Sequence, residues 1–263
     1  MVKAGEGKMS NESKLKSGVD WADLEKGALY IRERRLLSMI RETDFIEAIF
    51  HAWLGKKPAD NEKKMLNSVL VSFAGGWSII PPVVFSARLA ATTKAPMAQC
   101  LAAGFSSSGP AHTSAIESIM KVYIEENDIE AYVHEKIKRG EKISGFGHPV
   151  LARDPRPAEL RKRATELGIA GDAIGKFDKV QEILNEEKGI FANIDGINGA
   201  VLIDLGFKDP AYGPAFFLMG RSISMTAHII EEYRNKPFDA LNIVYPGFEK
   251  IEYEYRDTLE PDE

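Results

Sequence analysis

Apolar side chains recur along most of this chain at the three- and four-residue spacing of an amphipathic helix. The clearest stripe covers 45–54, where Phe, Ile, Ile, Phe, Trp and Leu share one face. Thr43 and Asp44 precede this stripe as candidate N-caps, and Gly55 follows it as a stop signal. The pattern therefore predicts a helix over 45–54 and a second helix after the break at Pro58.

The segment 79–103 is apolar, rich in alanine and poor in charge. It predicts one or two buried helices that begin at Pro81 and Pro82 and pack closely through small side chains. Helical spacing also marks four later segments: 114–123, 157–167, 172–184 and 216–233. Glycine-rich turns are expected between helices at 104–109, 145–147 and 196–199.

Strand patterns are few. They occur at 28–31 and in the alternation of Ile251, Tyr253 and Tyr255. The predicted fold class is mostly α. No internal repeat and no low-complexity linker divides the chain, so a domain boundary is expected at a glycine turn.

Composition narrows the possible partners. The chain has 263 residues, 44% of them apolar, which is enough for one large domain or two modest ones. A formal net charge of −5 leaves no large cationic field for nucleic acid or an anionic membrane surface, so we expect a small-molecule partner. Cys100 is the single cysteine, which excludes an intrachain disulfide and a zinc-finger spacing. The polar N-terminal 18 residues and the lack of a long apolar run predict a cytoplasmic protein.

Two segments carry residues suited to proton transfer. In the first, His148 stands between a glycine and a proline, and Arg156 follows eight residues later. In the second, Asp195 lies in a polar segment that reads Asn-Ile-Asp-Gly. A proton donor, an anion-binding guanidinium and a base are the parts that acid–base catalysis needs. The combination predicts an enzyme.

Each of these residues also has a structural interpretation. A single turn histidine, such as His112 or His148, more often caps a helix or binds backbone. Arg156 is as well explained by a surface ion pair, and Asp195 before a glycine is typical of a turn. Arg221 is different, because it interrupts an apolar helical run where a charge is costly unless it meets an anion. Taken together, the five residues favour function.

Other chemistries lack their sequence patterns. The segment 104–109 is rich in glycine and serine but lacks the Gly-Lys-Ser/Thr ending of a phosphate-binding loop. No Gly-x-Gly-x-x-Gly follows a predicted strand, so a bound NAD is not expected. His51, His134 and His228 show no metal-ligand spacing and are interpreted as structural. The sequence therefore predicts chemistry without a metal.

The ordered segments resemble the citrate synthase superfamily, which includes citryl-CoA lyase and the C-terminal lyase module of ATP-citrate lyase. The resemblance runs from about Leu24 to Pro246 and rests on these segments: 45–58, Gly109–His112, Gly145–His148, Asp154–Arg156, Asn193–Gly196 and Gly220–Ser222. It implies a mostly helical two-domain fold, with a large domain (1–112 and 206–263) and a small domain (113–205) that closes over the cleft. It also implies a homodimer or higher homo-oligomer. The short chain is closer to the compact lyases than to a typical synthase.

The resemblance implies a reaction that forms or breaks a carbon–carbon bond between acetyl-CoA and oxaloacetate through an enolate. In that reaction Asp195 would exchange a proton with the acetyl carbon, and His112 would bind the thioester oxygen. His148 would polarise the ketone or protonate the alkoxide. Arg156 and Arg221 would bind substrate carboxylates. Such a proton is so weakly acidic that its removal needs a stabilised oxyanion and exclusion of water.

Further positions follow from the same resemblance. A third carboxylate-binding cation, supplied by the partner subunit, would fall near Arg234 and Lys236. Coenzyme A would act as part of the substrate or product, with no tightly bound cofactor. Its expected contacts are the small-domain turn and two nearby cations: Ile143, Gly145, Phe146, Gly147, Arg153 and Lys188.

The chain also departs from the family pattern. Ser-Phe-Ala at 72–74 replaces a family Asp-His-Glu/Gly segment, so Phe73 and Trp77 are expected to line a more apolar pocket. Thr113 follows His112 where synthases usually carry glycine. These departures leave two alternatives open. One is the same aldol or Claisen chemistry on a less polar carbonyl substrate, and the other is a non-catalytic paralogue that binds CoA or an acid.

Overall fold

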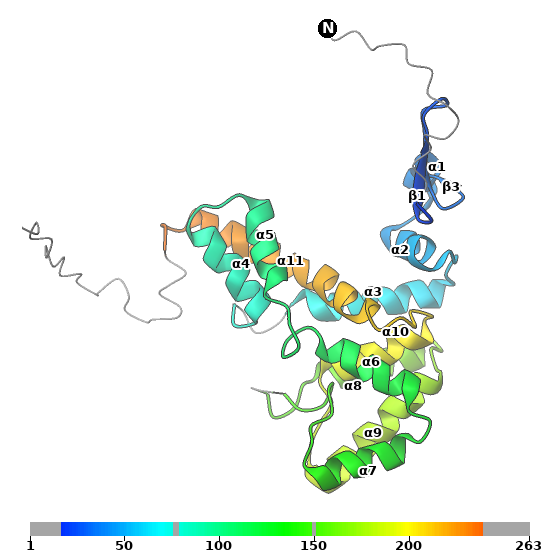
Figure 1. Cartoon of the computed structure of the whole chain (residues 1–263), viewed down its shortest axis with the longest axis vertical. Coiled ribbons are helices and arrows are strands. Elements are labelled where there is room, and N and C mark those ends of the chain that lie inside the picture. The colour runs from blue at the N-terminus through cyan, green and yellow to red at the C-terminus, as the bar shows by residue number, and fades with distance from the viewer. Residues whose placement is uncertain (1–16, 76–78, 149–150, 239–263) are drawn as a thin grey trace, which may run out of the picture.

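The computed structural model describes residues 17–75, 79–148 and 151–238. This part of the chain is mostly helical, with a small sheet at its N-terminal end (Figure 1). The strands are β1 (Asp20–Asp23), β2 (Ala28–Ile31) and β3 (Arg34–Arg35). The helices are α1 (Leu36–Glu42), α2 (Phe45–Leu54), α3 (Asp60–Ala74), α4 (Pro82–Thr92), α5 (Met97–Ser106), α6 (Ala115–Glu125), α7 (Ile129–Arg139), α8 (Arg156–Glu166), α9 (Asp172–Lys188), α10 (Ile194–Asp204) and α11 (Tyr212–Arg234).

Local signals explain where these helices begin and end. The Asp44 side chain accepts a hydrogen bond from the Glu47 backbone N–H and so caps α2, which ends at Gly55 in the left-handed conformation. The apolar segment 79–103 divides into α4 and α5 at a turn where Lys94 has a positive φ of 61°. The helices expected over 45–54, after Pro58 and from Pro82 are confirmed.

Two local predictions need correction. Residues 196–199 are not a turn but part of α10, because Asn193 caps the helix one residue before it begins. Gly104 lies within α5 rather than in a turn, and a Cβ on it would meet the Val83 carbonyl oxygen at 2.7 Å. Helix α1 was not expected from the sequence, and in α7 the expectation covered only the placement of His134 on a helix. The alternating segment at 251–255 lies outside the described residues.

Two groups of helices build the interior. In the first group α10 contacts α6, α8 and α9, and α7 packs on α9. In the second, α11 runs along α3, α4 and α5 (Figure 1). The larger apolar core extends from α2 and α3 through α6–α10 into the first half of α11. A smaller cluster joins α4, α5 and the second half of α11. Helix α11 therefore belongs to both clusters.

The small sheet is antiparallel in the order β1-β2-β3. Trp21 pairs with Tyr30 across the strands, and their rings stack with centroids 4.1 Å apart. His51 on α2 contacts the Ile31 carbonyl oxygen at 2.9 Å, which links the sheet to the helices. No helix among the described residues is long and apolar enough to cross a membrane.

Candidate active site

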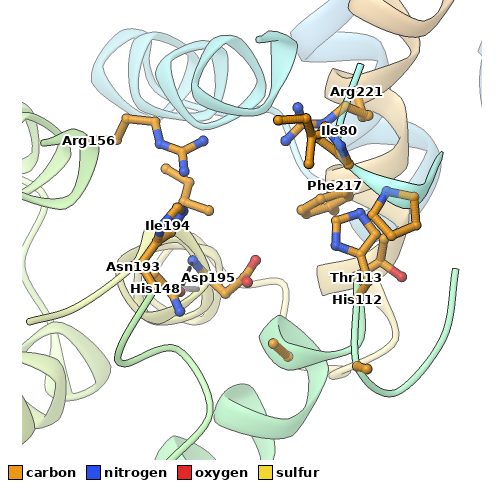
Figure 2. Close-up of a pocket in the computed structure, with 14 residues that line it drawn as sticks. Ile80, His112, Thr113, His148, Arg156, Asn193, Ile194, Asp195, Phe217 and Arg221 are labelled. Carbon is orange, nitrogen blue, oxygen red and sulfur yellow. Dashed lines mark hydrogen bonds between the residues drawn. The ribbon is translucent and has the colours of Figure 1, made fainter. Parts of the chain in front are cut away.

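A pocket of about 350 Å³ lies where α4, α6, α8, α10 and α11 meet. Figure 2 shows Asp195 and Asn193 at the start of α10 on one side of this pocket, opposite His112, Thr113 and Phe217. The lining brings together all five residues expected to carry the chemistry, although the chain separates them by more than 100 positions. Its residues are Ile80, Pro81, Pro82, Ala111, His112, Thr113, Ala115, His148, Arg156, Asn193, Ile194, Asp195, Phe217 and Arg221.

The start of α10 holds Asp195 in place. The Asn193 side-chain oxygen accepts a hydrogen bond from the Asp195 backbone N–H at 2.9 Å. The other end of the same amide donates to the Gly147 carbonyl oxygen at 2.7 Å. A Cβ on Gly145 would lie 2.7 Å from the Gly196 Cα, so the two segments approach as closely as two glycines allow. The His148 turn and the Asp195 helix are therefore positioned by each other.

The carboxyl group of Asp195 has an unusual environment. Its Oδ1 is buried, and no hydrogen-bond partner for it exists among the described residues. The residue as a whole is partly exposed, but burial of the carboxyl raises its pKa from 3.8 to about 7, against the lowering effects of Arg156 and Arg221. At neutral pH this carboxyl can therefore serve both as a base and as an acid.

His112 follows a tight turn. The backbone N–H of His112 donates to the Gly109 carbonyl, and the Gly109 N–H donates back to the His112 carbonyl, both at 2.9 Å. Its ring packs edge-on against Phe217, with centroids 5.5 Å apart. Its Nε2 is buried and meets no partner within the described residues. Burial, with a smaller contribution from Arg221, lowers the pKa of His112, so the ring is neutral at pH 7.

His148 has a defined tautomer. Its Nδ1 accepts a hydrogen bond from the Leu151 backbone N–H at 2.8 Å, so the neutral ring carries its proton on Nε2. Burial lowers the pKa of His148, Asp154 raises it, and Arg156 lowers it further. The neutral ring can then donate from Nε2 to a substrate oxygen.

The two arginines differ in how they are engaged. Arg156 binds Asp154 through Nε at 2.9 Å and through a terminal nitrogen at 2.8 Å, so the ion-pair interpretation holds while the residue still lines the pocket. Arg221 is 3% exposed and donates to the Gly75 carbonyl oxygen at 2.9 Å. Its Nε has no partner in the part of the chain that the structure describes. Burial lowers the pKa of Arg221 to about 10, which leaves it charged at neutral pH.

Some expected pocket residues lie elsewhere. Phe73 is fully buried behind the described pocket wall, and its ring packs on that of Phe217 at 4.9 Å. The expectation that Phe73 lines the pocket is therefore wrong for the described residues, because α3 turns this side chain into the core. Trp77 lies outside the described residues. Arg234 and Lys236 are exposed, and Arg234 is about 20 Å further along α11 than Arg221.

The residues expected to contact CoA lie in or near the turn 143–147 and are not part of the pocket lining. Gly145 and Gly147 have positive φ angles of 83° and 84°, and Ile143 is buried. The Phe146 ring stacks on Phe177 at 5.9 Å. Of the two expected cations, Arg153 stacks over the Phe191 ring at 4.8 Å, and Lys188 is exposed in the last turn of α9.

Sequence reasoning did not single out several lining residues. Asn193 had a recognisable signal, since an asparagine before an apolar helical run is a candidate N-cap. Thr113 was noted only as a departure from glycine. Ile80 and Phe217 carried no signal, because an apolar residue in an apolar run has no mark of its own. The described residues contain no group of three or more His, Cys, Asp or Glu arranged to hold a metal ion.

The fold and the pocket define a helical protein whose site places one buried carboxyl between two neutral histidines and two arginines. Comparison with known proteins identifies the family to which this chain belongs. Residues 20–246 match the model of the citrate synthase C-terminal domain. The chain therefore belongs to the citrate synthase family.

Individual relatives agree with this assignment. The chain is 31% identical over 209 residues to the citrate synthase of Heyndrickxia coagulans, covering 76% of this chain and 55% of that protein. It thus spans about half the length of the curated relatives it matches. The structure of citryl-CoA lyase from Hydrogenobacter thermophilus matches with a TM-score of 0.78 and 28% identity, covering 94% of both chains.

A third comparison shows the fold alone. ATP citrate lyase from Methanothrix soehngenii, in complex with citrate and coenzyme A, matches with a TM-score of 0.73 and 20% identity. The match covers all of this chain and 43% of that one. The mostly helical, citrate-synthase-like fold expected from the sequence is confirmed.

Proposed function

We propose that this protein forms or breaks the carbon–carbon bond between acetyl-CoA and oxaloacetate, in the manner of a citryl-CoA lyase or a citrate synthase. One observation carries the proposal. The unpartnered carboxyl of Asp195, with a pKa of about 7, shares a pocket with two histidines and two arginines among the described residues. Proton transfer at a weakly acidic carbon needs this combination of a tuned base and donors for the oxyanion.

In the cleavage direction, the hydroxyl proton of citryl-CoA passes to solvent, and the Nε2–H of His148 donates a hydrogen bond to the oxygen that loses it. The carbon–carbon bond then breaks, and its electron pair passes to the acetyl thioester, which becomes an enolate as oxaloacetate forms its ketone. His112 donates a hydrogen bond to the enolate oxygen, and protonated Asp195 gives its proton to the enolate carbon. Synthesis reverses each step, with Asp195 as the base and the Nε2–H of His148 polarising the ketone.

The two arginines support binding of a dicarboxylate. The Nε of Arg221 is buried without a partner in the described ranges, so a substrate carboxylate would satisfy it. Arg156 keeps N–H donors beyond the two that bind Asp154. The two hydrogen bonds to Asp154 hold its guanidinium rigidly. Coenzyme A would lie against the turn 143–147, with Arg153 and Lys188 available for its phosphates.

Domain closure and a homodimer complete this proposal. We assign 113–205 to a small domain that closes over the pocket, and 1–112 with 206–263 to the large one. The exposed apolar side chains Ile223 (60% exposed), Ile230 and Leu89 on α11 and α4 support a second copy packing there. A partner's Arg234 or Lys236 would then reach this pocket. The single buried Cys100 supports a cytoplasmic location.

The direct test uses the full-length protein with citryl-CoA, and acetyl-CoA with a panel of carbonyl acceptors. Acetyl-CoA release or consumption is followed by mass spectrometry. We expect turnover that depends on oxaloacetate or citryl-CoA and that Asp195→Asn abolishes. Asp204→Asn is the matched control, because Asp204 lies on the same helix but accepts hydrogen bonds from the backbone of α9. Equal loss in both variants would contradict the assigned role of Asp195.

One observation favours a second candidate, the same chemistry on a less polar carbonyl compound. The wall opposite Arg156 includes the apolar side chains of Ile80 and Phe217 (Figure 2). Turnover with an aldehyde or a monocarboxylic 2-oxo acid, but not with oxaloacetate, would select this candidate. Calorimetric binding of CoA thioesters without turnover of any acceptor would instead indicate a non-catalytic paralogue.

A further inference from the structure

Thr113 has a backbone conformation that its side chain disfavours. Its φ is +74°, in the left-handed region where β-branched residues are rarely found. The Gly109 carbonyl oxygen holds it there, because it accepts hydrogen bonds from the backbone N–H of His112 at 2.9 Å and of Ser114 at 3.4 Å. Glycine would adopt the same turn without strain. The turn alone therefore does not explain a threonine.

The hydroxyl of Thr113 adds a second cost. The residue is 2% exposed, and its Oγ1 is buried with no hydrogen-bond partner among the described residues. An unpaired buried hydroxyl destabilises a folded protein. Strain and an unsatisfied polar group at one residue are typical of a functional site rather than of a structural one.

The proposed catalytic groups, like Thr113, have a buried polar atom without a described partner. Asp195 Oδ1, His112 Nε2 and Arg221 Nε are likewise buried and unpartnered within 17–75, 79–148 and 151–238. All four residues line the same pocket, and Thr113 lies next to His112 on its wall (Figure 2). Ser108 provides a contrast, because its hydroxyl is also buried and unpartnered among the described residues but the residue is not part of the pocket lining.

We propose that the Thr113 hydroxyl donates a hydrogen bond to the thioester oxygen of the substrate, as a second donor beside His112. This inference rests on the proposed enolate chemistry. Negative charge develops on that oxygen when the enolate forms, so a donor already fixed in place stabilises the transition state more than the ground state. The strained backbone keeps the hydroxyl at the pocket wall.

Three variants of Thr113 separate this role from a structural one. Thr113→Val keeps the branched shape and removes the hydroxyl, so we expect kcat for citryl-CoA cleavage to fall about 100-fold, with KM changed less than about threefold. Thr113→Ser keeps the hydroxyl and should retain kcat within about threefold. Thr113→Gly relieves the strain but lacks the donor, so it should lose as much kcat as Thr113→Val. Ser108→Ala serves as the control with unchanged kcat.

Melting temperatures complete the test. Because the hydroxyl satisfies no described protein group, Thr113→Val should melt at the same temperature as the wild type or above it. A lower melting temperature would overturn the proposal, and so would a wild-type kcat in Thr113→Val. Equal losses in Thr113→Ser and Thr113→Val would also overturn it, because shape rather than the hydroxyl would then matter.

A separate binding measurement tests the Thr113 contact even if the proposed function fails. If the wild type turns over no substrate, that function is refuted, and the contact is tested by calorimetry with carboxymethyl-coenzyme A, whose carboxylate resembles an enolate. We expect Thr113→Val to bind this probe at least about tenfold more weakly than the wild type. Equal dissociation constants would overturn the Thr113 contact itself.

Discussion

Two buried carboxyl groups in this protein differ in their hydrogen-bond partners. Glu232, near the end of α11, is fully buried, and its two oxygens accept hydrogen bonds from Arg88 at 3.0 Å and Thr92 at 2.6 Å. The Oδ1 of Asp195 is buried too, yet it meets no partner among the described residues. A buried carboxylate with a complete set of partners joins helices, whereas an unpartnered one is destabilising and is kept for a ligand.

The surroundings of the two groups agree with this distinction. Glu232 lies on α11 between Ile229 and Tyr233, which belong to or pack on the smaller apolar cluster. Its partner Arg88 also binds Glu231 and contacts His228. Lys94 donates to the Glu232 carbonyl oxygen and so fastens the α4–α5 turn to the end of α11. Asp195 instead faces a pocket of about 350 Å³. The comparison predicts that changes at Asp195 affect activity, and changes at Glu232 affect stability.

The largest expected effect is the loss of catalysis in the variant Asp195→Asn. We expect kcat to fall at least about 10³-fold, because an amide neither accepts nor returns the proton. The free energy of unfolding should stay equal or rise, since the variant removes a group that is costly to ionise when buried. Enzyme assays and urea denaturation measure the two quantities. A folded variant with wild-type kcat would break the comparison.

Next in size is the loss of stability in Glu232→Ala. Arg88 would be left buried without its main partner, so the free energy of unfolding should fall by about 3–5 kcal/mol. Activity per folded molecule should not change. The double variant Arg88→Met with Glu232→Leu removes both charges and should recover most of the stability. A decrease in kcat with unchanged stability would contradict the structural role of Glu232.

The pH dependence sharpens the comparison further. The pKa of Asp195 is about 7 in the folded protein and 3.8 ordinarily, so between these values the folded state binds more protons at this group than the unfolded state. Its contribution to the free energy of unfolding is therefore present below about pH 4 and is lost as the pH rises to 7. Asp195→Asn should remove this trend from denaturation curves.

The same titration predicts activity. Synthesis needs the carboxylate form of Asp195, so its kcat/KM should rise about tenfold per pH unit below pH 7 and level off above it. Asp204→Asn should show the wild-type profile. A profile that is flat between pH 5 and 8 in the wild type would exclude Asp195 as the base.

The smallest expected effect concerns the cap that positions Asp195. Asn193→Ala removes a hydrogen bond to the start of α10 and another to the Gly147 carbonyl, which should cost about 1 kcal/mol of stability. It should also lower kcat several-fold. Asp44→Ala removes the corresponding cap of α2 and should cost similar stability without changing kcat. Equal kcat in both variants would show that the cap does not position Asp195.

Much of the fold was predictable because helix formation depends on local signals. The stripe at 45–54, the caps around it and the prolines before α4 all act within a few residues. The error at 196–199 arose where a local N-cap and a distant segment together outweigh the turn preference of glycine. Residues 196–199 were expected to form a turn, but the cap at Asn193 and the close packing of Gly145 on Gly196 place them in α10.

The sequence likewise predicted one part of the candidate site, the chemical groups, but not the other part, their burial. The residue types and their order along the chain indicated the carboxylate, the histidines and the arginines, and the resemblance to a known family assigned them roles. Burial could not be derived from that order. Phe73 was expected in the pocket but lies behind Phe217, and Thr113 gained importance only when its φ and its unpartnered hydroxyl were seen.

The sequence by itself determined the helical class, the family and the set of chemical groups, because these depend on residue identity, spacing and order. Only the tertiary structure decided which groups face each other and which charges are paired. The pKa of Asp195 and the contrast with Glu232 depend on desolvation and on distances between segments far apart in the chain, which no local pattern contains.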